Sequence, residues 1–194
     1  MADPDLPLIE ALKAGEDLAL NKLIQRHREA LYFFAFRYLH DESAARDVVQ
    51  ETFVRMYFKA SSFKPKSSVK TWLYTIAANL SRDRLRWLGK RHHVSLDAPT
   101  EAKAFHRELS AAEPNPSEQT ATRERFDELQ QAIDQLPDRL RLPLILCTLE
   151  GQSHKEVGEI LGLTPKAVEL RIYHAKAKLR EILGDSFTKN IAGD

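Results

Sequence analysis

The sequence lacks the features of a secreted or membrane-spanning protein. Its single cysteine, Cys147, excludes an internal disulfide and suits a reducing compartment. The longest strongly apolar runs, ALYFFAF and LPLILC, fall well short of the roughly 20 residues that cross a bilayer. The first residues, MADPDLPLIEALK, contain acids where a secretory signal has a basic region. We therefore expect a cytoplasmic protein without membrane insertion.

The sequence also lacks the motifs of an enzyme. It contains no glycine-rich loop for phosphate and no H-E-x-x-H pair for zinc. His92 and His93 are adjacent, so they do not share one helix face as metal ligands would. Cys147 lies in an apolar segment and is expected to be a small core residue. We expect no catalysis by this chain alone, no cofactor and no metal.

Glycine is scarce, with 7 residues in 194, and runs of β-branched residues are few, which favours a mostly helical fold. Hydrophobic residues make up 43% of the chain and charged residues 29%, as in globular proteins. The net charge of +1 by itself suggests no polyanionic partner. The hydrophobic and charged fractions together indicate a globular protein, and the scarcity of glycine and of β-branched runs indicates an all-helical one.

The distribution of charge is more informative than the total. Residues 63–93 hold eight Lys or Arg and one acid, and residues 164–181 hold five basic residues and two acids. Between these zones, residues 94–122 hold two basic residues and five acids. Two basic zones joined by an acidic connector favour a nucleic acid contacted at two places, although solvated helix faces would give the same pattern.

Hydrophobic spacing predicts three helices in the first half. Residues 20–38 repeat apolar residues every three or four positions. Residues 44–60 form a second helix, capped by Asp41 or Ser43. Pro65 marks a polar loop, after which residues 70–93 form a third helix. The core stripe expected for this third helix consists of Trp72, Leu73, Ile76, Ala77 and Leu80.

The second half carries the signals of a helix-turn-helix. Pro143 should bend the helix that contains it, and Gly151 should end that helix. Ser153 and Glu156 form a capping box for a short helix. A turn at Gly162 and Pro165 at a first helical position begin a longer helix with a basic outer side.

These pieces together resemble bacterial sigma factors of the extracytoplasmic-function group, the smallest members of the sigma-70 family. The resemblance rests on three signatures found in order: D-x-V-Q-E-x-F, T-W-L-x-x-I-A-x-N and L-E-G-x-S-x-x-E-V. It implies an all-α fold of two small helical domains, residues 1–94 and 123–194. The Pro-, Ser- and Glu-rich residues 95–122 would be the flexible linker, with a short helix near residues 102–109.

The resemblance also implies the function and the partners. Such a protein binds core RNA polymerase, through the β′ clamp helices and the β flap, and directs it to promoters. Asp47, Gln50 and Glu51 share one helix face and would accept hydrogen bonds from arginines of the clamp helices. An anti-sigma factor is a further expected partner. The linker would enter the RNA exit path, although a plain tether explains its composition equally well.

In the family, the loop and helix after Phe63 read and help to melt the promoter −10 element. A flipped base needs a pocket, and the phosphates need cations. The residues implied to bind the −10 DNA are Lys64, Lys66, Ser67, Ser68, Lys70, Asn79, Arg82, Arg84, Arg86 and Arg91. Trp72 is assigned to the core, whereas Tyr74 and Trp87 could contact either protein or DNA.

The family reads the −35 element with the last helix, which implies a second set of residues. These are Lys166, Glu169, Leu170, Arg171, Tyr173 and His174. Many members have a basic residue where Glu169 stands, and often Arg where His174 stands. Because glutamate can accept a hydrogen bond from cytosine N4, we hypothesise an altered −35 preference. The alternative function is a helix-turn-helix regulator that does not replace a sigma subunit.

Overall fold

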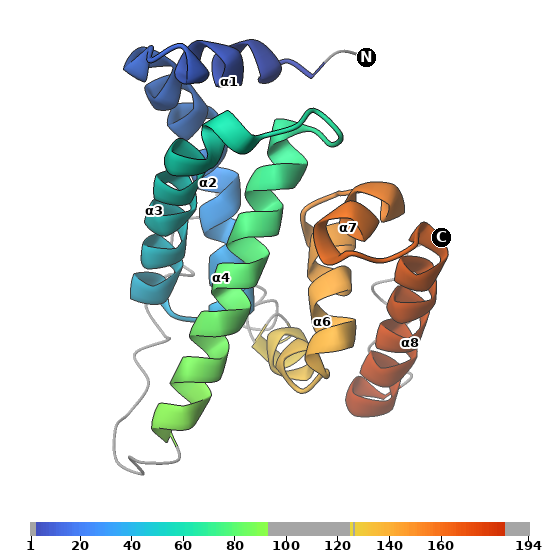
Figure 1. Ribbon diagram of the computed structural model, residues 1–194. Helices are drawn as coiled ribbons and strands as arrows, with labels where there is room; N and C mark the ends of the chain where they lie inside the picture. The colour runs from blue at the N-terminus through green and yellow to red at the C-terminus, as the bar shows by residue number, and fades with distance from the viewer. Residues whose placement is uncertain (1–2, 93–124, 126, 185–194) are drawn as a thin grey trace, which may run out of the picture. The chain divides into compact units, whose positions relative to one another are not determined.

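The computed structural model describes residues 3–92, 125 and 127–184, with residues 89–92 described as helical backbone only. Figure 1 shows helices joined by short turns, and within these residues no strand occurs, so the predicted all-α class is confirmed. The helices are α1 (Leu6–Lys13), α2 (Asp17–Leu39), α3 (Glu42–Lys59), the 3-10 turn η1 (Ala60–Ser62), α4 (Val69–His92), a helix over residues 127–134, α6 (Asp138–Leu144), the π-helix η3 (Ile145–Leu149), α7 (His154–Leu161) and α8 (Pro165–Leu183).

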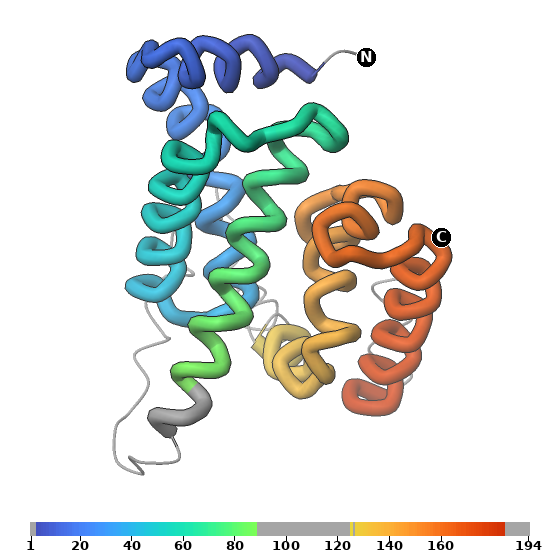
Figure 2. Tube along the Cα trace, in the orientation of Figure 1, coloured from blue at the N-terminus to red at the C-terminus, as the bar shows by residue number. Residues whose placement is uncertain are grey.

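These helices divide between two compact units that interleave along the chain. The residue ranges of the units can be followed by colour along the tube in Figure 2. The first unit takes α1 to α4 together with residues 145–165, which include η3 and α7. The second takes the helix over residues 127–134, α6 and α8 from Lys166 onward. The predicted linker, residues 95–122, and its short helix lie outside the described residues, as do the predicted domain boundaries.

The core of the first unit forms where α2, α3 and α4 pack together. Leu31 and Phe34 of α2 are fully buried, and the Phe34 ring lies 5.4 Å from the ring of Tyr74 on α4. Met56 of α3 and Leu73 of α4 are also fully buried. Close packing of these large apolar side chains fixes how α3 and α4 present their outer faces.

The core stripe predicted for α4 is partly wrong. Leu73 and Ala77 are buried as expected, whereas Trp72, Ile76 and Leu80 stay partly exposed. Tyr74 is buried instead. The prediction assumed one buried face, but α4 contacts α2 and α3 on one side and α7 on another within the same unit. A second covered side shifts the buried stripe around the helix.

The distortion expected at Pro143 appears just after it. The α-helix ends at Leu144, and Glu150 N donates to Ile145 O at 3.1 Å, the five-residue spacing of a π-helix. Proline lacks the N–H that a regular helix would use, so this change in hydrogen bonding occurs where the ladder is already interrupted. Gly151 follows with a positive φ of 64°.

The turn between α7 and α8 forms as the sequence predicts. The Ser153 hydroxyl accepts from Glu156 N and the Glu156 carboxylate accepts from Ser153 N, which completes the capping box. Gly162 adopts the left-handed conformation, and α8 starts at Pro165. Gly158 was not singled out from the sequence, yet a Cβ there would lie 2.6 Å from the Leu163 carbonyl oxygen. That contact requires glycine for a turn this tight.

Candidate functional site

The outer face of α3 carries acceptors for hydrogen bonds. Asp47 and Gln50 are exposed and Glu51 is half-buried, while Met56 points into the core. Glu51 accepts from Arg55 Nε at 2.7 Å along the same helix. The predicted polymerase-binding residues therefore share one accessible face, as their spacing requires. Two carboxylates and an amide on such a face suit guanidinium groups of a partner.

The loop over residues 63–68 presents cations at its tip. Lys64 and Lys66 are exposed, and Ser67 is half-buried. Ser68 caps α4, because its hydroxyl accepts from Thr71 N at 3.0 Å and lies 2.8 Å from Thr71 Oγ1. The structure shows this capping role, which the sequence analysis did not assign, while the contact of Ser68 with DNA stays a prediction.

The start of the loop is fixed by an aromatic contact. The ring of Phe63 lies 4.8 Å from the ring of Trp72, and Phe63 is buried. Trp72 is half-buried and therefore belongs to the support of the loop more than to the centre of the core. Near the other end, Lys70 Nζ lies 5.9 Å from the centre of the buried Tyr74 ring.

The outer face of α4 extends this basic surface along the helix. Asn79 and Arg86 are exposed and Arg82 is half-buried. Asn79 lies eleven residues after Ser68, which corresponds to about 16 Å of helix rise. The loop and the face of α4 therefore offer contacts spaced along several nucleotides. Of Arg91, only the helical backbone is described.

Arg84 departs from a simple DNA-binding assignment. Its guanidinium donates to the Asp47 carboxylate at 3.1 Å, and its carbon Cζ lies 4.7 Å from the centre of the Trp87 ring. The sequence left the role of Trp87 open. The structure places its ring, which is partly exposed, against a cation three residues earlier on the same helix. The i, i+3 spacing of arginine and tryptophan was the available signal for this pair.

The outer face of α8 contains the residues predicted to read the −35 element. Leu170 is 53% exposed and Tyr173 is 66% exposed, which is unusual for large apolar side chains. Lys166 donates to both oxygens of Glu169 at 3.0 Å. The acid that departs from the family pattern is thus paired with a neighbouring base in the free protein.

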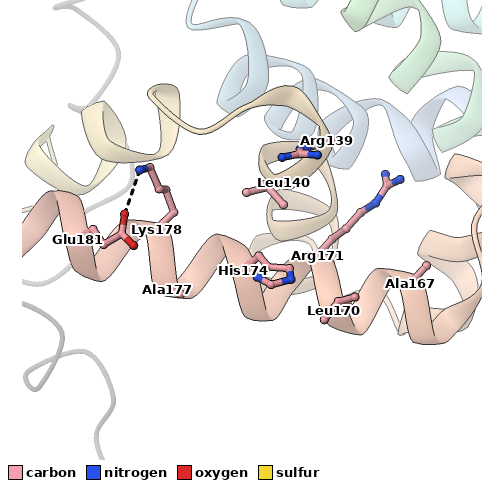
Figure 3. A pocket seen from close by; sticks show the side chains of 9 residues that line it. All are labelled: Arg139, Leu140, Ala167, Leu170, Arg171, His174, Ala177, Lys178 and Glu181. Atoms are coloured by element: carbon pink, nitrogen blue, oxygen red, sulfur yellow. Dashed lines mark hydrogen bonds and ion pairs between the residues drawn. The ribbon is translucent and has the colours of Figure 1, made fainter.

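A pocket of about 530 Å³ lies beside this face in the second unit (Figure 3). It brings together three predicted residues, Leu170, Arg171 and His174, with Arg139 of α6, which the sequence analysis missed. Lys166, Glu169 and Tyr173 do not line it. The remaining lining residues are Leu140, Ala167, Ala177, Lys178 and Glu181. No pattern within α8 could have indicated Arg139, because Arg139 lies on α6.

Two perturbed pKa values in the first unit have structural causes. Burial, reinforced by Glu150, raises the pKa of Tyr74, whose hydroxyl donates to Glu150 at 3.1 Å. Burial, and to a smaller extent Glu156, raises the pKa of Cys147 to about 11. A thiol with this pKa is protonated near neutral pH, so Cys147 has the character of an inert side chain.

The described residues contain no group of three or more His, Cys, Asp or Glu side chains placed to hold a metal ion. In the same part of the chain, none of the helices combines the length and apolar character needed to cross a membrane. What the described surface does offer is exposed basic residues on a loop and two helices, one of them in a helix-turn-helix. These features are typical of nucleic-acid-binding proteins.

Comparison with known proteins identifies the family to which this chain belongs. Residues 23–91 match the family model of Sigma-70 region 2, and residues 126–179 match that of Sigma-70 region 4. The chain is 30% identical over 178 residues to the ECF RNA polymerase sigma factor SigW of Bacillus subtilis, covering 91% of this chain and 95% of SigW. It is 33% identical over 177 residues to the RNA polymerase sigma factor CarQ of Myxococcus xanthus, covering 91% and 96%.

A solved structure agrees with these relatives. CnrH, determined in complex with the cytosolic domain of CnrY, superposes with a TM-score of 0.68 at 28% identity, covering 92% of this chain and 96% of CnrH. The chain belongs to the sigma-70 family, in its extracytoplasmic-function group. It is an RNA polymerase sigma factor that directs transcription initiation, which confirms the identification made from the sequence motifs.

Proposed function

We propose that this sigma factor uses three separate surfaces during initiation. The face of α3 with Asp47, Gln50 and Glu51 binds the clamp helices of core polymerase. The loop over residues 63–68 and the outer face of α4 bind the −10 DNA. The outer face of α8 binds the −35 element. The sigma factor supplies specificity and the polymerase supplies the catalysis, in the cytoplasm where both act on the chromosome.

The observation that carries this proposal is the segregation of charge between α3 and α4. The outer face of α3 presents Asp47 and Glu51, whereas the loop and the outer face of α4 present cations. Phosphate repels the first surface and attracts the second, so DNA and an arginine-rich protein surface are directed to different helices. Melted DNA then lies along α4 without competing for the site of polymerase docking.

The geometry of the loop supports base capture. Opening a promoter costs a few kcal/mol of stacking energy for each flipped base, and a fixed pocket offsets that cost. Ser67 is half-buried next to the exposed Lys66, so a hydroxyl and a cation lie within one residue of each other. The lysine contacts a phosphate while the serine contacts the base that has left the stack.

The surface of α8 supports readout of duplex DNA. Lys166, Glu169, Leu170 and Tyr173 all lie exposed over its first three turns, and the first turns of a recognition helix contact base edges. Arg171 and His174, near Arg139 at the pocket, hold a phosphate beside the groove. Glu169 reads a base once Lys166 has turned to a phosphate.

An anti-sigma factor is a further proposed partner. The similar CnrH was solved with the cytosolic domain of another protein, CnrY, bound to it. A protein segment of that kind would cover exposed apolar side chains of the first unit, such as Phe58 of α3, which is 77% exposed. The β flap of the polymerase is the partner proposed for the region 4 part of the chain.

In vitro transcription tests the proposal. Core polymerase is mixed with this protein and genomic fragments, and the transcripts are mapped to their starts. We expect transcripts that core polymerase alone does not make, with shared −10 and −35 sequences upstream. The Lys64→Gln, Lys66→Gln double variant should lose opening at these promoters, while the Glu29→Gln variant, which alters an exposed residue of α2, should not. Normal opening by the double variant would overturn the assignment of the loop.

A further inference from the structure

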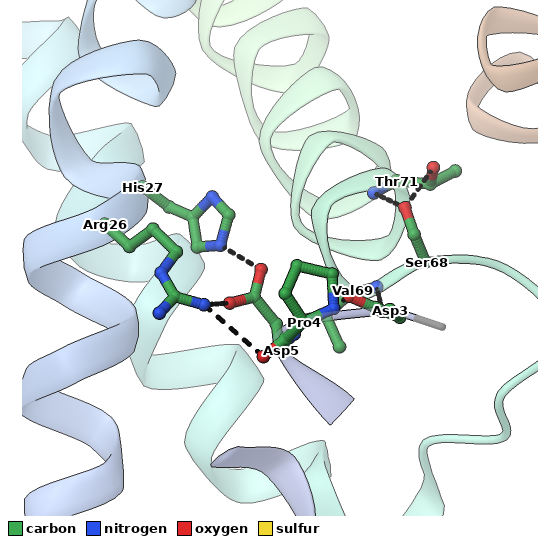
Figure 4. A network of polar contacts seen from close by, with 8 residues as sticks. All are labelled: Asp3, Pro4, Asp5, Arg26, His27, Ser68, Val69 and Thr71. Atoms are coloured by element: carbon green, nitrogen blue, oxygen red, sulfur yellow. Dashed lines mark hydrogen bonds and ion pairs between the residues drawn. The ribbon is translucent and has the colours of Figure 1, made fainter. Parts of the chain in front are cut away.

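The segment before α2 contacts both ends of the loop over residues 63–68. At the start of the loop, Lys13 Nζ donates to the Phe63 carbonyl oxygen at 3.3 Å and lies 5.9 Å from the centre of its ring. At the end of the loop, Asp3 Oδ2 accepts from Val69 N at 2.6 Å (Figure 4). The partners are separated by 50 and 66 residues in sequence, so both contacts are tertiary.

The contact of Asp3 completes the first turn of α4. Backbone N–H groups in that turn have no acceptor within the helix. Ser68 accepts from Thr71 N, and Asp3 accepts from Val69 N, the first residue of the helix. A carboxylate also interacts favourably with the positive end of the helix dipole. Asp3 thereby fixes the point at which the loop ends and the helix begins.

The segment that carries Asp3 is itself anchored. Asp5 is only 3% exposed, and its Oδ2 lies 2.7 Å from Nε2 of the buried His27 on α2. Arg26 donates to the other oxygen of Asp5. Asp5 N donates back to Asp3 Oδ1 at 3.0 Å, so both oxygens of Asp3 accept a backbone hydrogen bond. Figure 4 shows this chain of contacts from α2 to the start of α4.

We propose that residues 3–13 form an N-terminal clamp that positions the loop over residues 63–68, the −10 loop, for single-stranded promoter DNA. Asp3 and Lys13 are its positioning residues, and the inference rests on the proposed function of the loop. Five residues, 64–68, lie between the two fixed ends. Holding both ends reduces the number of loop conformations, so less entropy is lost when DNA binds.

A direct effect of the Asp3 charge on DNA predicts a different result. A carboxylate near the −10 strand repels phosphate, so its removal would strengthen DNA binding. A positioning role predicts weaker binding instead. The two roles also differ in the order of variants, because asparagine keeps one acceptor oxygen and alanine keeps none. Positioning predicts wild type above Asp3→Asn and Asp3→Ala lowest, whereas repulsion predicts that both neutral variants bind more tightly.

The experiment uses holoenzyme on a promoter identified by the transcription assay. Permanganate reactivity of unpaired thymines measures opening, and a pre-melted −10 fragment measures binding to the loop. We expect Asp3→Ala to weaken both by about tenfold, as for the loss of one charge-assisted hydrogen bond. Amide hydrogen exchange should quicken in residues 63–69 and stay unchanged in the middle of α3. Association with core polymerase should also stay unchanged.

Matched variants separate the possible failures. Glu29→Gln, which removes an exposed carboxylate from α2, should leave every measurement unchanged. If the Lys64→Gln, Lys66→Gln double variant weakens opening but Asp3→Ala does not, the clamp is overturned and the function of the loop stands. If the double variant has no effect, the proposed function of the loop fails, and the clamp with it. Equal loss of core binding and opening in Asp3→Ala would indicate general destabilisation and overturn the positioning role.

Discussion

The guanidinium of Arg84 on α4 donates to the carboxylate of Asp47 on α3, with Nη2 3.1 Å from Oδ2. The pair joins a residue proposed to bind DNA to a residue proposed to bind polymerase. Both side chains are solvent-accessible, at 33% for Arg84 and 59% for Asp47. Asp47 is therefore accessible to arginines of a partner, and we propose that their binding frees Arg84 to contact a phosphate.

Replacing Asp47 tests the polymerase-binding face. We expect Asp47→Asn to weaken association with core polymerase by about tenfold, because an amide forms weaker hydrogen bonds to guanidinium than a carboxylate does. The free energy of unfolding should change by less than about 1 kcal/mol, since exposed ion pairs contribute little. Fluorescence titration with labelled core and urea unfolding provide the two values.

The control for this variant is Glu42→Gln on the same helix. Glu42 pairs with Arg46, so this variant also removes one negative charge and breaks one surface ion pair, here between two side chains of α3. Equal weakening of core binding by Glu42→Gln would show that total charge, not the face of Asp47, controls the association. Unchanged binding by Asp47→Asn would remove Asp47 from the docking surface.

Asn79 tests the outer face of α4. The side chain is exposed, so Asn79→Ala should leave the fold and core binding intact. Loss of its amide removes hydrogen bonds to a base edge, and we expect about tenfold slower promoter opening. Stopped-flow fluorescence of 2-aminopurine in the −10 element measures this rate. A variant that opens promoters at the normal rate would exclude Asn79 from strand recognition.

Glu169 tests specificity at the −35 element. We expect Glu169→Arg to change the preferred −35 base, because arginine favours guanine whereas glutamate accepts from cytosine. Binding to libraries of −35 sequences measures the preference. The matched control is Glu181→Arg, which changes the charge equally and also breaks an i, i+3 pair, with Lys178. If the two variants give the same base preference, whether it equals that of the wild type or differs from it, Glu169 does not read a base.

The capping box at the start of α7 makes stability depend on pH. The hydroxyl and the backbone N–H of Ser153 lower the pKa of Glu156 from its ordinary value of 4.5. The folded state therefore holds the ionised carboxylate more strongly than the unfolded state does. This stabilisation is present above pH 4.5 and is lost as the pH falls through the lower pKa of the folded state.

We expect Glu156→Gln to reduce that dependence, because glutamine keeps an acceptor for the cap but does not titrate. Urea unfolding at neutral and acid pH should give midpoints that converge in acid for the wild type and the variant. A difference between the two proteins that stays constant with pH would mean that the ionised carboxylate does not stabilise the cap.

Local signals in the sequence predicted much of the second half. Ser153 and Glu156 define a cap by their spacing, and Gly162 and Pro165 define a turn and a helix start. These features need only neighbouring residues, so they can be inferred without knowledge of the fold. The same holds for Asp47, Gln50 and Glu51, because a helix of known register places them on one face.

The features that the sequence predicted wrongly or not at all share one physical cause, which is contact with residues distant in the sequence. The stripe of α4 was misjudged because α7 covers a second side of that helix, and no periodicity within α4 reveals a distant neighbour. The helix α1 was not predicted, and neither was its contact through Lys13 with the −10 loop. Arg139 joined the pocket of α8 from another helix.

By itself, the sequence determined the all-helical class, the caps and turns, the charged faces and, through its motifs, the sigma-70 family. Each of these depends on residues within a few turns of one another or on their order along the chain. Only the tertiary structure decided that Arg84 pairs with Asp47 and that Asp3 holds the start of α4. Those hydrogen bonds join residues 37 and 66 positions apart, and their geometry depends on how the helices pack.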